Sequence, residues 1–153
     1  MNLLRLSAAQ LARLADLGQA AWPREACALL VGHGDGDALQ VSEIVPADNI
    51  STDPEREFEL DPAVHFATLR RLRDDPMRTN SMIGHDSIIG HWHSHPNGRS
   101  EPSAKDVAMI NDPGLVWLIS AVHDGRASAP HAFRAVSQAT GFGFLPLTIE
   151  QQD

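Results

Sequence analysis

The chain has 153 residues, of which 42% are hydrophobic, and we expect residues 1–153 to form a single domain with its own core. Its formal net charge of −8 argues against a protein that binds nucleic acid through the phosphate backbone. The sequence contains no apolar run near the roughly 18 residues that a membrane helix needs, residues 1–4 lack the basic start of a signal peptide, and one cysteine cannot form an internal disulfide, so we expect a cytoplasmic protein.

A helix is predicted at the start of the chain. Ser7 can cap it, and Gln10 completes a capping box. Leucines and alanines at helical spacing continue to residue 21. Trp22-Pro23 ends the helix, because the residue before a proline is pushed out of the helical region.

Two strands are predicted next. Residues 26–31 form a continuous apolar run typical of a central strand, and residues 39–45 form the returning strand. Residues 32–37 lie between them and are rich in Gly and Asp, which predicts a hairpin turn. His33, Asp35 and Asp37 alternate in this segment and could form a second metal loop, but an ordinary turn is the favoured interpretation.

The middle of the chain is predicted to be a loop, a short strand and a second helix. Residues 46–56 are polar, and residues 58–60 are a strand candidate. Asp61 and Pro62 are typical of a helix start. We expect apolar side chains of this helix to be buried and its arginines to face solvent; the apolar set is Val64, Phe66, Ala67, Leu69 and Leu72. Residues 74–86 form a longer polar connector, which we interpret as a flap or a disordered excursion.

Histidines at alternate positions end the next predicted strand. The buried body of this strand is residues 87–90. It continues through His91-Trp92-His93-Ser94-His95 and ends at Pro96, which has no N–H to donate to a neighbouring strand. Side chains of a strand alternate between faces, so His93 and His95 point the same way and can converge on one ion if the strand end twists. His91 shares their face, and we interpret it as a group behind the ligands or as packing.

A short helix with an acidic first turn follows the histidine strand. Ser103 resembles an N-cap, and Asp106 at the third helical position makes a variant of the capping box. The helix is predicted over residues 103–111. A carboxylate and a hydroxyl would thus lie on the first turn of a helix that can fold back toward the histidines.

The C-terminal part is predicted to be three strands. Residues 115–122 are apolar, Asp124-Gly125 opens a turn, and residues 131–136 alternate. Residues 143–149 form a last strand, which Pro146 places at an edge. The whole pattern indicates an α+β fold, with a mixed, curved sheet flanked by helices.

Two imidazoles and one carboxylate make a three-ligand zinc site with a position open for water, which is the catalytic arrangement. Closed structural sites rely on cysteine, of which this chain has one. A lone histidine at a strand end is more often structural than a ligand. The alternating histidines followed by Ser-x-x-Asp favour a metal site at His93, His95 and Asp106, whereas Glu101 is the alternative carboxylate.

These residues resemble the metal motif of the JAMM (JAB1/MPN/Mov34) metalloprotease family. The matching residues are His93-Ser94-His95-Pro96 and Ser103-x-x-Asp106, and residues 23–32 resemble the family's upstream segment with Glu25 as its acid. The resemblance covers most of the chain and implies a single MPN-type domain, which is cytidine-deaminase-like in architecture. As a small, single-domain member, the chain resembles the bacterial single-domain type of this family.

The resemblance also implies the chemistry. It implies zinc at His93, His95 and Asp106, with hydrolysis of a peptide or isopeptide bond through metal-activated water. Glu25 would be the general base and then the acid, although a solvated residue at a helix-to-strand junction is the commoner role of a glutamate. Ser103 would donate to the oxyanion, although a pure N-cap role is equally open.

The expected partner is a protein or peptide, with no nucleic acid and no membrane. Relatives cut after the C-terminus of ubiquitin or ubiquitin-like proteins, and small bacterial forms process ubiquitin-like sulfur-carrier proteins. The alternative is a non-catalytic MPN-type binding or scaffold module, but all the motif positions are filled. A zinc deaminase needs His-x-Glu and Pro-Cys-x-x-Cys, and the sequence has neither.

Three residues near the motif have other predicted roles. Trp92 is expected in the core, Ser94 is expected to orient the loop or a partner group, and Cys27 is expected to be buried packing rather than a nucleophile. The substrate, the native metal and the oligomeric state remain open at this point.

Overall fold

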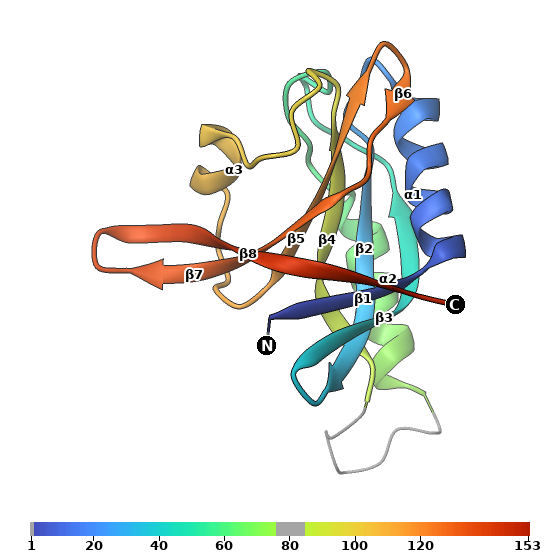
Figure 1. Ribbon diagram of the computed structural model, residues 1–153, viewed down its shortest axis with the longest axis vertical. Coiled ribbons are helices and arrows are strands. Elements are labelled where there is room, and N and C mark those ends of the chain that lie inside the picture. The colour runs from blue at the N-terminus through green and yellow to red at the C-terminus, as the bar shows by residue number, and fades with distance from the viewer. Residues whose placement is uncertain (1, 76–84) are drawn as a thin grey trace.

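A single curved sheet of eight strands organises the molecule (Figure 1). The computed structural model describes residues 2–75 and 85–153, so most of the predicted 74–86 connector lies outside the described residues. The strands are β1 (Leu3–Ser7), β2 (Cys27–Asp35), β3 (Ala38–Ala47), β4 (Ser87–His95), β5 (Val116–His123), β6 (Arg126–Ala127), β7 (His131–Gln138) and β8 (Gly141–Gln152). The helices are α1 (Ala8–Ala21), α2 (Pro62–Arg73) and α3 (Ala104–Ala108).

The sheet curves until its ends meet. Its order is β4-β2-β3-β1-β8-β7-β5-β6, and β4 also pairs with β5, so the sheet closes through a parallel contact between the two strands. Antiparallel pairs and parallel pairs both occur, which confirms the predicted mixed, curved sheet.

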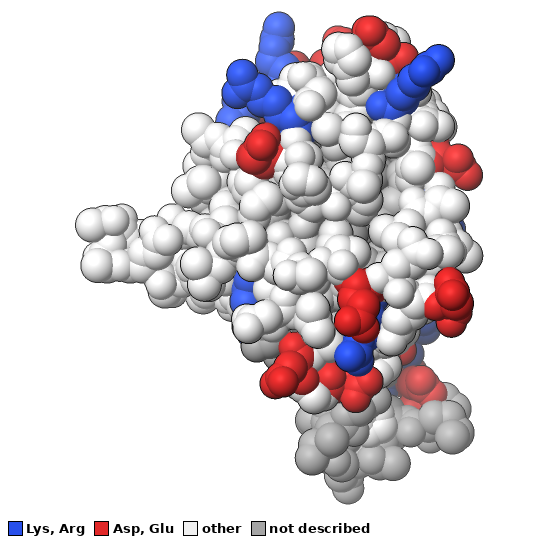
Figure 2. Space-filling model, viewed as in Figure 1, with Lys and Arg blue, Asp and Glu red and all other residues white. Residues whose placement is uncertain are grey.

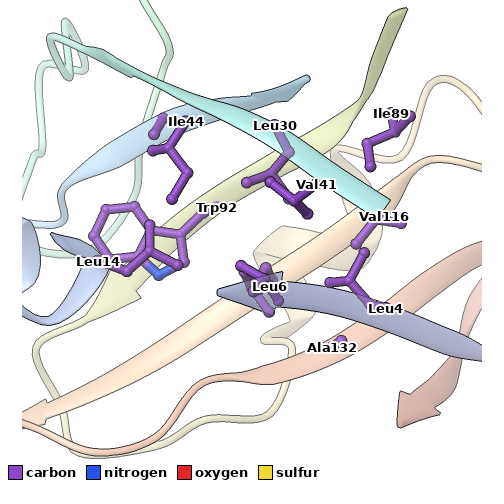
Figure 3. Packing of buried hydrophobic residues seen from close by; sticks show 12 residues of the cluster. Leu4, Leu6, Leu14, Leu30, Val41, Ile44, Ile89, Trp92, Val116 and Ala132 are labelled. Atoms are coloured by element: carbon purple, nitrogen blue, oxygen red, sulfur yellow. The ribbon is translucent and has the colours of Figure 1, made fainter. Parts of the chain in front are cut away.

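The main core fills the inside of this curve, where α1 packs against the strands. Its members alternate along the strands with residues of the outer face, and Figure 3 shows them gathered between the strands. The largest fully buried members are Leu4, Leu6, Leu14, Leu30, Trp92 and Leu118. Trp92 is fully buried as predicted, and its indole N–H donates to Ser120 Oγ at 2.8 Å.

A second, smaller cluster lies on the outer face. It comprises Cys27, Phe58, Ile110, Trp117 and Ala135. Cys27 stands opposite His93 in the β2–β4 ladder, and Trp117 stands opposite His91 in the β4–β5 ladder. This cluster therefore packs against the face of β4 that carries the histidines.

Helix α1 begins and ends as predicted. The Ser7 hydroxyl accepts from Gln10 N at 3.0 Å, and the Gln10 side chain accepts from Ser7 N at 2.9 Å, which completes the capping box. The helix ends at Ala21, before the cis Trp22-Pro23 bond.

The predicted turn at residues 32–37 is wrong in its extent, because β2 continues to Asp35 and only two residues turn. A bulge between Val31 and Gly32 lets the strand continue. A Cβ on Gly32 would lie 2.0 Å from the Gln40 carbonyl oxygen, so only glycine permits this approach of β3.

Three other expectations are corrected. Residues 58–60 form no strand, because only Leu60 makes a bridge, to Asn49. Helix α2 buries Thr68 and Leu72, one turn apart, so Phe66 and Leu69 are 63% and 45% exposed instead of buried. Helix α3 ends at Ala108 rather than at residue 111.

The last strand has a different neighbour along each half of its length. Residues 141–147 of β8 pair with β7, with Pro146 opposite Phe133, while residues 148–152 pair with β1. Pro146 thus lies in the half of β8 that pairs with β7 alone among the described strands, which confirms the predicted edge position there, and its missing N–H costs little. The pairing with β1, which had no sequence signal, places β8 between β7 and β1 in the strand order.

The β7–β8 hairpin projects from the body of the protein (Figure 1). Residues 135–149 contain no Asp, Glu, Lys or Arg, and Figure 2 shows the projection without charged side chains on the visible face. No helix of the described residues is long and apolar enough to cross a membrane.

Candidate metal centre

His93 and His95 converge at the end of β4, as their alternation predicts. Their Nε2 atoms lie 2.9 Å apart, and the residues are 0% and 5% exposed. His95 Nδ1 donates to the Arg99 carbonyl oxygen at 3.0 Å, so Nδ1 carries a proton and Nε2 is the atom that faces His93 and Asp106.

Asp106 brings its carboxylate from α3 to the same point. One oxygen is 3.1 Å from His95 Nε2 and the other is 3.4 Å from His93 Nε2. The capping box fixes this carboxylate, because Ser103 N donates to Asp106 Oδ2 at 2.8 Å and Asp106 N donates to Ser103 Oγ at 3.1 Å. The hydrogen bonds of the predicted helix cap therefore also hold the carboxylate of the predicted metal ligand.

Glu25 lies beside the two histidines. Ligand atoms of Glu25, His93 and His95 are all within 4.8 Å of one another, and Glu25 is 5% exposed. Burial raises the pKa of Glu25 from 4.5 to about 7, against a lowering by the charge of His95. The structure thus brings Glu25, His93, His95, Ser103 and Asp106 together, while Glu101 is exposed.

Backbone contacts on both sides hold Glu25 in place. Ala26 N donates to Ser94 Oγ at 2.8 Å, and Ser94 N donates to the Ala26 carbonyl at 3.0 Å. Glu25 N donates to the Pro54 carbonyl at 2.7 Å. Ser94 therefore ties the Glu25 segment to the histidine strand, which agrees with its predicted orienting role.

Asn49 is a positioning residue that the sequence did not reveal. Its amide Nδ2 donates to the carbonyls of Glu25 at 2.9 Å and Glu57 at 3.0 Å. Its Oδ1 accepts from Ser51 N at 3.1 Å and Glu59 N at 3.0 Å. An asparagine in a polar loop is common, and only its tertiary contacts distinguish this one.

The charges of the cluster are coupled. Burial alone would raise the pKa of Asp106, but hydrogen bonds from His93, His95 and Ser103 N outweigh it and hold that pKa far below its usual value. Burial lowers the pKa of His93 despite its contact with Asp106. For His95 the contacts with Asp106 and the charge of Glu25 outweigh burial, so its pKa is raised.

The donor set fits a divalent transition metal ion. Two imidazole nitrogens and a carboxylate oxygen face one point from rigid elements, and zinc binds such atoms at about 2.0–2.2 Å in catalytic sites with three protein ligands. The Arg99 carbonyl fixes one ligand ring in the tautomer that coordination through Nε2 requires.

Aromatic side chains pack around the ligand His93. Phe58 stacks on its ring with centroids 4.4 Å apart, and Trp117 contacts it edge-on at 5.8 Å. His91 packs against Trp117 at 4.3 Å, and burial lowers the pKa of His91 to about 3. Cys27 lies below and is 3% exposed, as expected for a packing residue.

A groove of about 720 Å³ runs beside Glu25. Its walls come from the end of α1, the start of β2, the end of β3 and the following loop; they include Leu17, Arg24, Glu25, Cys27, Asn49 and Ile50. Lys105 Nζ lies 3.6 Å from Glu57 Oε2, which links α3 to this loop near the metal centre.

Comparison with known proteins places the chain in a family. A family model described as prokaryotic homologs of the JAB domain matches residues 7–136, which span the Glu25 segment, the histidine strand and α3. The chain belongs to this family. A curated relative, a desampylase of Haloferax volcanii, is 34% identical over 107 residues, covering 70% of this JAB-domain chain and 68% of the relative.

Solved structures agree with this assignment. A protein from Desulfitobacterium hafniense superposes with a TM-score of 0.74 at 25% identity, covering 97% of this JAB-domain chain and 94% of its own. A JAB1/MPN-domain protein from Archaeoglobus fulgidus superposes with a TM-score of 0.51 at 17% identity, covering 97% and 98%. The MPN-type fold implied by the sequence motif is therefore confirmed.

Proposed function

We propose that the protein is a zinc-dependent peptidase or isopeptidase that hydrolyses the bond after the C-terminal tail of a ubiquitin-like protein. The observation that carries this proposal is the buried Glu25 carboxyl group within 4.8 Å of the ligand nitrogens of His93 and His95. A purely structural metal site has no need of a buried acid beside it, and hydrolysis does.

His93, His95 and Asp106 would hold the ion. A bound zinc ion lowers the pKa of water toward about 7 and polarises a carbonyl group. Asp106 stays ionised because His93, His95 and Ser103 N surround its carboxylate, so it would offer the ion one negative charge beside the two imidazoles.

Glu25 would move the proton. Its carboxylate takes a proton from the attacking water and delivers it to the leaving amine, which needs an acid whose pKa lies near the working pH. Burial places the pKa of Glu25 at about 7, so both protonation states are accessible at neutral pH. Asn49 and Ser94 keep this carboxyl group beside the histidines through the backbone of residues 25 and 26.

Ser103 would stabilise the oxyanion. Its Oγ accepts from Asp106 N, and a hydroxyl that accepts one hydrogen bond still has its own proton to donate. The N-cap role and the oxyanion role are thus compatible for this hydroxyl. The donor would point at the carbonyl oxygen of the scissile bond, where negative charge develops.

The similarity to a desampylase supports a ubiquitin-like protein as the substrate class, and small bacterial relatives of the motif suggest a sulfur-carrier protein. The groove beside Glu25 has room for an extended tail. A reducing cytoplasm suits the buried, unpaired Cys27.

Cleavage of a fusion tests the proposal. A ubiquitin-like sulfur carrier joined through its C-terminal tail to a reporter peptide should be cut at the junction by the zinc-loaded protein. A chelator should stop cleavage, and added Zn²⁺ should restore it. Binding of the fusion without cleavage, at full zinc occupancy, would instead support the scaffold alternative.

A further inference from the structure

Two buried ring nitrogens next to the metal centre have no hydrogen-bond partner among the described residues. They are Nδ1 of His91 and Nδ1 of His93. His95 differs, because its Nδ1 bonds to the Arg99 carbonyl oxygen at 3.0 Å. Buried polar atoms are nearly always paired with protein or with ordered water, so the two nitrogens require an explanation.

The two rings are neighbours that do not touch directly. His91 and His93 are two residues apart on one face of β4, and their ring centroids are 5.9 Å apart. The rings of His93 and His95, whose Nε2 atoms are in hydrogen-bonding contact, have centroids only 4.8 Å apart. The wider separation exceeds a direct bond between imidazoles and suits one bridging molecule.

Aromatic rings from the described residues pack against the two histidines. Phe58 stacks on His93 at 4.4 Å, and Trp117 packs edge-on against His91 at 4.3 Å. These aromatic walls are apolar, and both Nδ1 atoms are buried away from bulk solvent. A small polar site between apolar walls is where a buried water is retained.

We propose that one buried water joins His93 Nδ1 to His91 Nδ1, and that His91 is thereby a positioning residue for the metal ligand His93. This inference rests on the proposed zinc site. Coordination through His93 Nε2 puts the proton of the neutral ring on Nδ1, which then needs an acceptor. The water accepts that proton's hydrogen bond and donates to His91 Nδ1, so the proton of His91 sits on its Nε2.

The consequence is a difference between the two ligands. His95 is oriented by a backbone carbonyl, which no substitution at a side chain removes, whereas His93 depends on the side chain at position 91. Loss of such an outer partner typically lowers metal affinity about 10–100-fold. If His91 served only as packing, an apolar side chain of similar size would replace it without effect on the ion.

Two variants separate these roles. His91→Leu removes the acceptor and keeps the volume, while His91→Gln restores an acceptor oxygen on the same strand face. Zn²⁺ affinity is measured by competition with a chromophoric chelator. His91→Leu should bind Zn²⁺ about 10–100-fold more weakly than the wild type, and His91→Gln should recover most of that loss. Equal affinity of His91→Leu and the wild type, or no recovery in His91→Gln, would overturn the inference.

Imidazole ¹⁵N spectra of the zinc-loaded wild type give a second readout that needs no variant. They should show His93 protonated at Nδ1 and His91 protonated at Nε2. A proton on Nδ1 of His91 would exclude the proposed water bridge. If the protein binds Zn²⁺ and shows this protonation pattern but cuts no fusion, the proposed activity is wrong and the water bridge between His93 and His91 still stands. If the wild type does not bind Zn²⁺, both proposals are wrong.

Discussion

In the proposed function, Glu25 is the residue that separates hydrolysis from metal binding alone. Its carboxyl group is buried next to two imidazoles, and burial raises its pKa to about 7. Its backbone is held by hydrogen bonds to Pro54 and Asn49. The side chain is thus held in position while its oxygens remain available for a proton.

Replacing Glu25 by Gln should separate binding from chemistry. The amide has nearly the same shape but cannot carry a proton from water to the leaving amine, so cleavage of the fusion should fall about 10²–10⁴-fold. Zinc content, measured by mass spectrometry of the purified protein, should stay at the wild-type level. Glu59→Gln, at an exposed position of the loop between β3 and α2, is the matched control and should leave cleavage unchanged.

Cys27 should be nearly inert in the folded protein. Burial raises the pKa of its thiol from 9.0 to about 12, and the thiolate is the reactive species. Because the folded pKa is raised, the labelling rate with iodoacetamide should remain far below that of the denatured chain at pH 8 and continue to rise with pH beyond 9. Equal labelling rates in buffer and in denaturant would show that Cys27, the first residue of β2, is accessible to solvent in the folded protein.

At the scale of elements, the loop between β3 and α2 fixes one side of the site. The Asn49 side chain hydrogen-bonds the Glu25 carbonyl and also the backbone of three residues of this loop: Ser51, Glu57 and Glu59. Asn49→Ala should lower the free energy of unfolding by about 1–3 kcal/mol, because buried partners are left unpaired, and should also reduce cleavage by displacing Glu25. Urea unfolding and the cleavage assay measure the two effects. Unchanged cleavage would show that Ser94 alone positions Glu25.

The caps of α1 and α3 have the same local geometry but different roles. Ser103→Ala should lower cleavage about 10²–10³-fold if its hydroxyl stabilises the oxyanion, whereas Ser7→Ala should cost about 1 kcal/mol of stability and leave cleavage unchanged. Thermal unfolding checks that both variants fold. If the two substitutions affect only stability, and equally, Ser103 is a cap and nothing more.

At the scale of the whole molecule, the predictable features were those with a local physical cause. The capping boxes at Ser7 and Ser103 and the alternation of His93 and His95 depend on neighbours within a few residues, and the structure has them as predicted. The side-chain face of a strand and the start of a helix are set by the backbone itself.

The features that escaped prediction depend on partners far along the chain. Residues 3–7 become a strand because β3 and β8 pair with them on either side. Phe66 and Leu69 were expected to be buried, but α2 meets the sheet along a narrower face than its apolar pattern suggests. Asn49 was invisible because its four main partners come together only in the folded chain.

The central claim is that His93, His95 and Asp106 bind one zinc ion beneath Glu25. Anomalous diffraction at the zinc edge, from crystals of the zinc-loaded protein, tests it most directly. We predict one strong peak about 2.0–2.2 Å from His93 Nε2, His95 Nε2 and an Asp106 oxygen, and the same peak in Glu25→Gln. A fully occupied peak elsewhere, or a site that is empty under saturating Zn²⁺, would contradict the account.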